Sequence, residues 1–138
     1  MNTSTPSSAA ETESLREAYA ALNCNDIAEF VKNFDPQVEW SEPADFPGGG
    51  TYRGLDAVKA HITKSRADWA EGTCEPQRFI AAGDKIVVFD HVHVRLKHET
   101  EWREGDIGDV YTFRNGKIIH VRVFPDRRQA LEWAGAKE

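Results

Sequence analysis

The sequence lacks several features that mark particular classes of protein. Its 138 residues include only two cysteines, Cys24 and Cys74, in no metal-binding or CxxC spacing, so we expect reduced, structural thiols. Positive charge is also scarce: the formal net charge is −6, which argues against nucleic acid as a partner. No apolar run approaches the roughly 20 residues that span a bilayer, so we expect no membrane partner. Together these absences favour a cytoplasmic globular protein.

Length and composition predict one domain with one core. A hydrophobic fraction of 40% and a charged fraction of 29% are ordinary for a globular protein, and no repeat or long linker divides the chain. Residues 1–11 are rich in Ser, Thr and Ala and have neither the basic flank nor the apolar stretch of a signal peptide. We therefore expect a flexible N-terminal tail over residues 1–11 and a single domain over residues 12–138.

Helical patterns dominate the first half of the chain. Ser14 and Glu17 have the spacing of a capping box, which predicts that the first helix begins there. Asp26 can cap a short second helix, which we expect to end at Asp35, before a proline. Apolar side chains at helical spacing predict a third helix over residues 55–69.

Strand patterns account for most of the rest. The predicted strands are residues 38–43, 77–82, 85–97, 102–114 and 117–124. Asn115-Gly116 is the strongest short hairpin signal, so the last two strands should be antiparallel neighbours. A terminal helix is predicted between Asp126, a cap, and Gly135, a stop. Helices followed by a meander of strands predict an α+β fold, in which helices on one face of a curved sheet enclose a space for a ligand.

Several strings of residues have a familiar order. They are Tyr19–Asp26, Val38–Pro43, Thr51–Val58, Asn115–Ile118 and Asp126–Leu131. This order resembles the nuclear-transport-factor-2-like superfamily, and its closing part is similar to the polyketide-cyclase-like (SnoaL-like) branch, over roughly residues 12–135. The resemblance implies a cone-shaped domain, the cystatin-like roll, with a curved mixed or antiparallel sheet packed on the N-terminal helices. Proteins of this fold include isomerases, dehydratases, cyclases, epoxide hydrolases and plain binding subunits.

Strand alternation places two carboxylates on otherwise apolar faces. Asp90 has the parity of the apolar even positions of its predicted strand, and Asp109 has that of Ile107, Tyr111 and Phe113. Burying an ionised carboxylate without partners is so costly that the group normally protonates or finds donors. Each acid is therefore either part of a site or hydrogen-bonded for structural reasons, and both interpretations stay open.

The resemblance extends to catalytic positions of ketosteroid isomerases. Asp109 precedes a Val-Tyr-Thr-Phe run and the closing hairpin, as does the acid that donates a hydrogen bond to the oxyanion in those enzymes. Glu42, before Pro43, stands where they have their general base. The resemblance thus implies Glu42 and Asp109 as catalytic residues. Their helix-one tyrosine aligns with Ala18, one residue before Tyr19, and one residue turns a helical side chain by about 100°.

The other candidates are side chains that we expect to contact a ligand. They are Tyr19, Trp40, Tyr52, Asp90, Tyr111 and Val121. For the aromatic residues, packing as part of the pocket wall is the alternative role. His61 adjoins the apolar Ile62 on the third helix, and we expect it to be solvated or satisfied.

The opposite, outer face of the predicted sheet carries His91, His93 and His120. Strand spacing near 4.8 Å would put His120 about 10 Å from the other two, too far for one zinc ion, so we expect no metal. Gly48–Gly50 lacks the Lys-Ser/Thr of a phosphate loop, so we expect no cofactor. The resemblance implies a homodimer through this face, which also holds Arg95, Val110, Thr112 and Arg122.

Three functions remain open from the sequence. The first is an isomerase, dehydratase or cyclase that uses Glu42 and Asp109 for acid–base chemistry on an apolar substrate. The second is a binding protein whose carboxylates only orient a small apolar ligand. The third is an association module that acts through the outer sheet face.

Overall fold

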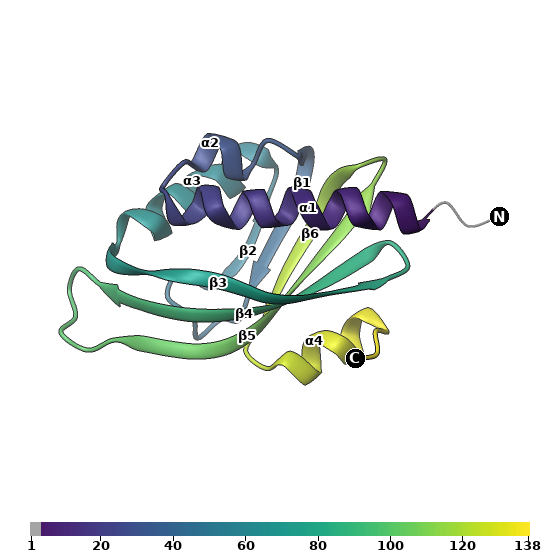
Figure 1. Cartoon of the computed structure of the whole chain (residues 1–138). Coiled ribbons are helices and arrows are strands. Elements are labelled where there is room, and N and C mark those ends of the chain that lie inside the picture. The colour runs from purple at the N-terminus through teal and green to yellow at the C-terminus, as the bar shows by residue number, and fades with distance from the viewer. Residues whose placement is uncertain (1–3) are drawn as a thin grey trace.

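A computed structural model describes residues 4–138 (Figure 1), and it has the predicted α+β architecture. Six strands form one curved, open sheet in the order β2-β1-β6-β5-β4-β3, with β1 parallel to β6 and all other neighbours antiparallel. The strands are β1 (Phe34–Glu42), β2 (Gly50–Arg53), β3 (Trp69–Ala82), β4 (Lys85–Leu96), β5 (Arg103–Arg114) and β6 (Lys117–Phe124). The helices are α1 (Ser4–Asn23), α2 (Ile27–Phe30), α3 (Leu55–Ala67) and α4 (Arg127–Ala134).

The helices divide between the two faces of the sheet (Figure 1). The N-terminal three lie over the concave face, and α4 lies on the opposite face, against β4 and β5. The larger core fills the space between the concave face and α1–α3 and includes Leu15, Val58 and Val88. A smaller core lies under α4, where Gly108 lets the helix approach so closely that an added Cβ would be 2.6 Å from that of Ala130. No described helix is both long and apolar enough to cross a membrane.

Helix α1 begins ten residues before the predicted capping box. Ser14 is not a cap; its hydroxyl donates to the carbonyl of Glu11, 2.7 Å away, inside the helix. Residues 4–11, which we predicted as tail, continue the helix, because the Ala and Glu residues that precede Ser14 are strong helix formers. Residues 1–3 of the predicted tail lie outside the described residues, and the domain boundary at residue 12 stays a prediction.

The prediction of a third helix through Trp69 was wrong, because α3 ends at Ala67 and Trp69 begins β3. Strand β3 therefore starts eight residues before Gln77, the predicted start. Pro76 argued against a strand here, because proline has no N–H to donate to a neighbouring strand. The sheet tolerates Pro76 because β3 is an edge strand whose register shifts at this point.

The helix caps and the hairpin turn that the sequence predicted are present in the structure. The side chain of Asp26 caps α2, that of Asp126 caps α4, and Gly135 ends α4 in the left-handed conformation. The Asn115-Gly116 turn joins β5 and β6 as antiparallel neighbours. In β6, Ile119 is an extra residue without a partner in β5, because Thr112 pairs with His120 and Phe113 with Ile118. This bulge breaks the simple alternation, so that Ile118 lies in the larger core.

Candidate active site

A cavity of about 200 Å³ lies between the helices and the concave face of the sheet. Its walls are mostly aromatic and aliphatic, and they include Phe30, Phe46, Ile62, Trp69 and Ile107. A wider groove of about 410 Å³ shares Phe46, Trp69 and Ile107 with it. We therefore regard the groove as the vestibule of the cavity. Apolar walls with a few convergent polar groups are typical of small-molecule sites.

Four polar side chains from three elements meet at the closed end of the cavity, and we call them the acid cluster: Tyr19, Asp90, Asp109 and Tyr111. The Tyr111 hydroxyl donates to the Tyr19 hydroxyl at 2.9 Å, and the Tyr19 hydroxyl donates to Asp109 Oδ2 at 2.5 Å. Helix α1 thus supplies the donor that strand β5 needs for its buried carboxylate. The two rings also meet edge to face.

Asp90 and Asp109 act as a pair. In the antiparallel register Asp90 opposes Ile107 and Val88 opposes Asp109, so the acids are diagonal neighbours on one face. Asp90 Oδ1 and Asp109 Oδ1 are both fully buried and have no donor among the described groups other than a proton of the pair itself. Burial, then the charge of Asp109 and a hydrogen bond with it, raises the pKa of Asp90 to about 9. The pair therefore holds one shared proton near neutral pH.

Burial also raises the pKa values of the other members of the acid cluster. Burial raises the pKa of Asp109 to about 6, although the hydrogen bonds from Tyr19 and Asp90 oppose the rise. Burial and the charge of Asp109 raise the pKa of both tyrosines well above the ordinary value, so both phenols keep their protons. Cys74 also lines the cavity, and burial raises the pKa of its thiol, which leaves it unreactive.

A second polar group, Glu42 and His61, comes from β1 and α3. Glu42 Oε2 accepts a hydrogen bond from Trp40 Nε1 at 2.7 Å and lies 2.6 Å from His61 Nε2. Both side chains are nearly buried, with 13% of Glu42 and 4% of His61 exposed. The ring of Tyr52 stacks on His61 at 3.9 Å. Glu42 lines the cavity and His61 lines the groove, so this pair stands where the two meet.

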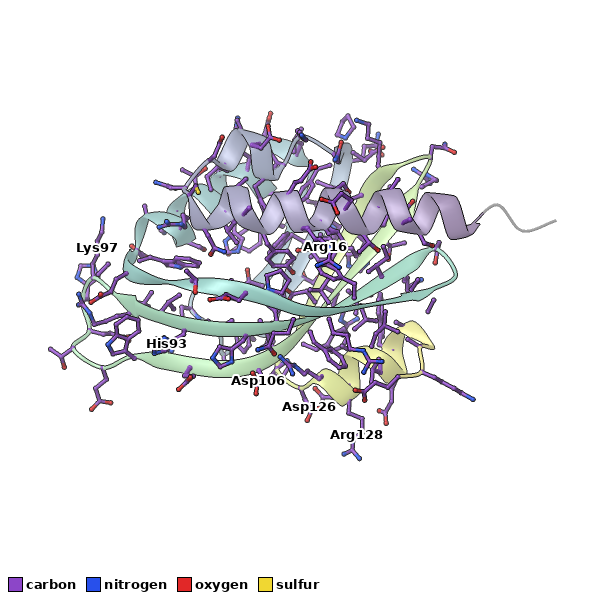
Figure 2. The ribbon with its side chains drawn as sticks, viewed as in Figure 1. Arg16, His93, Lys97, Asp106, Asp126 and Arg128 are labelled. Atoms are coloured by element: carbon purple, nitrogen blue, oxygen red, sulfur yellow. The ribbon has the colours of Figure 1, made fainter. Side chains whose placement is uncertain are left out.

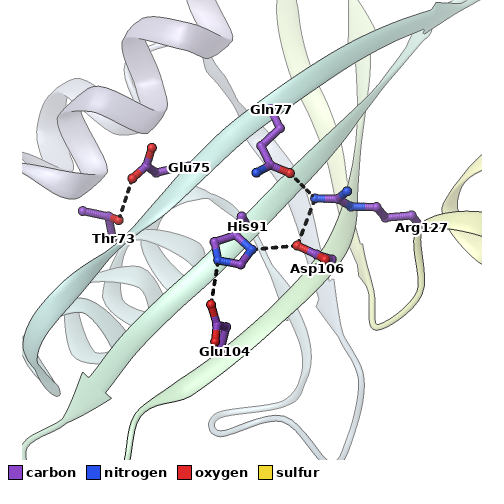
Figure 3. Close-up of polar contacts among 7 residues, drawn as sticks. All are labelled: Thr73, Glu75, Gln77, His91, Glu104, Asp106 and Arg127. Atoms are coloured by element: carbon purple, nitrogen blue, oxygen red, sulfur yellow. Dashed lines mark hydrogen bonds and ion pairs between the residues drawn. The ribbon is translucent and has the colours of Figure 1, made fainter.

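The outer face of the sheet holds a separate polar network (Figure 3). His91 bonds Asp106 through Nδ1 at 2.7 Å and Glu104 through Nε2 at 3.1 Å, and the bond to Asp106 raises the pKa of His91. Arg127 joins Asp106 to Gln77. Figure 2 shows His93 and Asp106 on the side of the sheet away from α1. Among the described residues, no group of three or more His, Cys, Asp and Glu side chains is arranged to hold a metal ion.

Helix α4 covers part of this outer face, which we predicted as an open dimer surface. Val110 is already fully buried beneath it, so dimerisation cannot remove solvent from this residue. Trp133 of α4 lies against His120, 5.8 Å between ring centroids, and the guanidinium of Arg122 lies 5.2 Å from the centroid of the same indole. The part left open is the end of β4 and β5, where His93 stacks on the exposed Trp102.

Comparison with known proteins agrees with this architecture. The sequence matches the SnoaL-like domain family over residues 15–121. The chain belongs to the SnoaL-like domain family. No curated protein matches the sequence.

Solved structures with the same fold extend over nearly the whole SnoaL-like chain. An NTF2-like protein of unknown function from Burkholderia pseudomallei is 25% identical, with 90% of this chain and 96% of the other covered and a TM-score of 0.75. TerC, co-crystallised with polyporic acid, is also 25% identical over the same shares, with a TM-score of 0.73. A cystatin-fold protein from Novosphingobium aromaticivorans, 17% identical with 83% and 97% covered and a TM-score of 0.71, supports the fold alone.

The structure of the SnoaL-like domain brings most of the predicted site residues together. Those that line the cavity are Tyr19, Trp40, Glu42, Asp90, Asp109 and Tyr111. Tyr52 lines the groove instead, where its hydroxyl donates to the carbonyl of Gly48. Val121 lines neither space; it is fully buried in the larger core.

His61 was missed as a site residue, although a signal for it was present. Val58, His61, Ile62 and Ser65 have the i, i+3, i+4, i+7 spacing of one helix face, so the pattern that placed Ile62 inward places His61 there as well. One ring nitrogen of His61 has a hydrogen-bond partner, and that partner is the predicted catalytic Glu42. Tyr19, one residue beyond the isomerase tyrosine position, nevertheless reaches Asp109.

Proposed function

We propose that this SnoaL-like protein binds a small, mostly apolar molecule in the cavity and catalyses proton transfer on it, as an isomerase, cyclase or dehydratase. The acid cluster carries the proposal. Two carboxyls on an apolar wall share a proton, and their pKa values are raised mainly by burial. Such strongly perturbed carboxyls in a cavity are typical of catalytic sites.

The cost of the acid cluster supports a functional role. A buried carboxyl pair destabilises the fold unless donors satisfy it, and packed apolar side chains of similar size would often do better. The chain instead supplies a tyrosine donor from α1 for Asp109 and leaves Asp90 at the cavity wall. This arrangement keeps a proton available in an apolar space at neutral pH.

The roles follow from the two polar groups of the site. In the acid cluster, the shared proton of Asp90 and Asp109 is available to an oxygen of the substrate on which negative charge develops. Glu42 belongs to the second group, which removes a proton from carbon. A positioned acid or base contributes roughly 10²–10⁴-fold to the rate of such a reaction.

The aromatic side chains that line the cavity favour an aromatic or polycyclic ligand. Phe30, Phe46, Trp40 and Trp69 surround the cavity, and flat rings bury much area against such side chains. The related TerC was co-crystallised with polyporic acid, which makes that compound a rational first binding probe for this chain.

The test is proton exchange on a small apolar ketone. In heavy water, the wild-type protein should speed the replacement of the α-hydrogens of β-tetralone by deuterium, followed by NMR. Asp109→Asn keeps the shape of the side chain but removes the acid, and we expect it to abolish the exchange with an unchanged circular dichroism spectrum. Asp45→Asn, which alters an exposed aspartate, is the matched control and should keep the full rate.

Two results would decide against catalysis. If the wild-type protein quenches its tryptophan fluorescence on adding polyporic acid but exchanges no hydrogen, it is a binding protein. If Asp109→Asn exchanges at the wild-type rate, the acid cluster is structural. In that case the substitution should instead lower stability, by about 1–3 kcal/mol, because a buried partner loses its hydrogen bond.

A further inference from the structure

The imidazole of His61 is held in one orientation by groups on all sides. Its Nε2 lies 2.6 Å from Glu42 Oε2, and the Tyr52 ring stacks on it at an angle of 14°. Gly48, with φ of +75°, lies so close that an added Cβ would be 3.2 Å from His61 Cε1. Tyr52 anchors the same loop through its hydroxyl bond to the Gly48 carbonyl. A flip of the ring would break the Glu42 contact.

The other ring nitrogen is left free. His61 Nδ1 has no hydrogen-bond partner among the described groups, and it is not one of the fully buried polar atoms. His61 lines the groove beside Ser65 and Trp69, both of which also line the cavity. A carboxylate on one imidazole nitrogen fixes the proton there and leaves the lone pair on the other.

Glu42 is less available than the imidazole. Its Oε2 already meets both Trp40 Nε1 and His61 Nε2, two groups that direct its charge toward the ring. A carboxylate fixed by an indole donor and an imidazole is arranged like the outer partner of a carboxylate–histidine pair.

We propose that His61 Nδ1 is the atom that takes the proton from the substrate, and that Glu42 is a positioning residue that holds His61 in the reactive tautomer. This inference rests on the proposed function and identifies the base within it. The substrate class is a carbonyl compound with an acidic C–H next to the carbonyl, which binds where the groove meets the cavity.

The step balances without any co-reactant. The lone pair of Nδ1 takes the α-proton, the C–H electron pair becomes the carbon–carbon double bond of an enol, and the carbonyl π electrons move to oxygen. That oxygen accepts the shared proton of Asp90 and Asp109. Return of a proton from Nδ1 to the same or a neighbouring carbon, and of the oxygen-bound proton to the acid pair, completes exchange or isomerisation.

The experiment uses β-tetralone exchange in heavy water with variants of the full chain. His61→Gly should lower the exchange rate at least about 100-fold, and added imidazole should restore part of it. Glu42→Gln should also lower the rate, and imidazole should not rescue it, because His61 still occupies the site. His98→Gln, in an exposed turn, is the matched control and should keep the wild-type rate.

Nitrogen-15 NMR of the histidines gives a readout independent of turnover. The wild-type His61 should carry its proton on Nε2, and Glu42→Gln should shift the population toward the other tautomer. Exchange that survives His61→Gly, or a proton found on Nδ1 alone, overturns the inference, while loss of exchange in Asp109→Asn keeps the proposed function. A wild-type protein without exchange activity overturns both. His61→Gln, which retains a donor for Glu42, repeats the test if the glycine variant does not fold.

Discussion

Replacing Asp90 by Asn should change how the stability of the protein depends on pH. Asn has the shape of Asp, and its amide can donate to the otherwise orphaned Asp109 Oδ1, but it does not titrate. Below about pH 4 the wild-type chain holds the Asp90 proton both folded and unfolded. Above that pH, and up to the folded-state pKa of about 9, only the folded chain holds it. The unfolded state then binds fewer protons, so the free energy of unfolding falls as the pH rises.

The magnitude follows from this linkage. Each pH unit in that window lowers the wild-type free energy of unfolding by roughly 1.4 kcal/mol through Asp90. Between about pH 5 and pH 8 the loss is on the order of 4 kcal/mol, which the variant does not suffer. Asp109 titrates together with Asp90, so the difference between the two curves reports the proton that the pair loses when Asp90 is replaced. The variant should therefore gain stability relative to the wild type as the pH rises.

Urea unfolding at a series of pH values measures this difference directly. The wild type, Asp90→Asn and the exposed control Asp45→Asn are compared at constant ionic strength, with the same slope against denaturant required of all three. The control should run parallel to the wild type. A difference between Asp90→Asn and the wild type that stays constant with pH would show that Asp90 titrates normally, and the shared-proton pair would have to be abandoned.

Three further predictions concern the rest of the molecule. Gly108→Ala should lower the free energy of unfolding, measured in urea, by about 1–3 kcal/mol, because the new methyl group overlaps Ala130. Gly105→Ala, whose new methyl group meets open space, is the control and should lower it far less. We expect a homodimer that uses the open end of the outer face, around His93 and Trp102, and light scattering that gives a monomer at micromolar concentration would refute it. Added zinc should leave the melting temperature unchanged, because the three outer-face histidines make other contacts; tight binding would raise it.

The sequence predicted the acid cluster better than it predicted the strands that carry it. Asp90 and Asp109 were placed inward because β-strand side chains alternate, and β4 and β5 keep that period through both acids. In β6 a simple alternation does not hold, because the bulge places Ile118 rather than Ile119 in the larger core. A bulge depends on the paired strand and its turn, so a single strand's pattern does not reveal it.

Local sequence patterns could not predict which residues far apart in the chain contact one another. Tyr19 and Asp109 are 90 positions apart, and Glu42 and His61 are 19 apart on different elements. The resemblance to ketosteroid isomerases suggested that Tyr19 was rotated away from the site, but the orientation of α1 against the sheet decides where its side chains point. That orientation is a property of tertiary packing.

The two polar groups of the site come from different elements, and this makes their roles separable by experiment. The acid cluster is held by α1, β4 and β5, while Glu42 and His61 are held by β1 and α3. No hydrogen bond between described residues connects His61 to the acid cluster, so substitutions of His61 and Asp109 should have nearly additive effects on stability. Catalysis should behave differently, because the reaction needs both groups at once. A double variant, Asp109→Asn with His61→Gln, should therefore lose no more exchange activity than the more damaged single variant, while its stability losses sum.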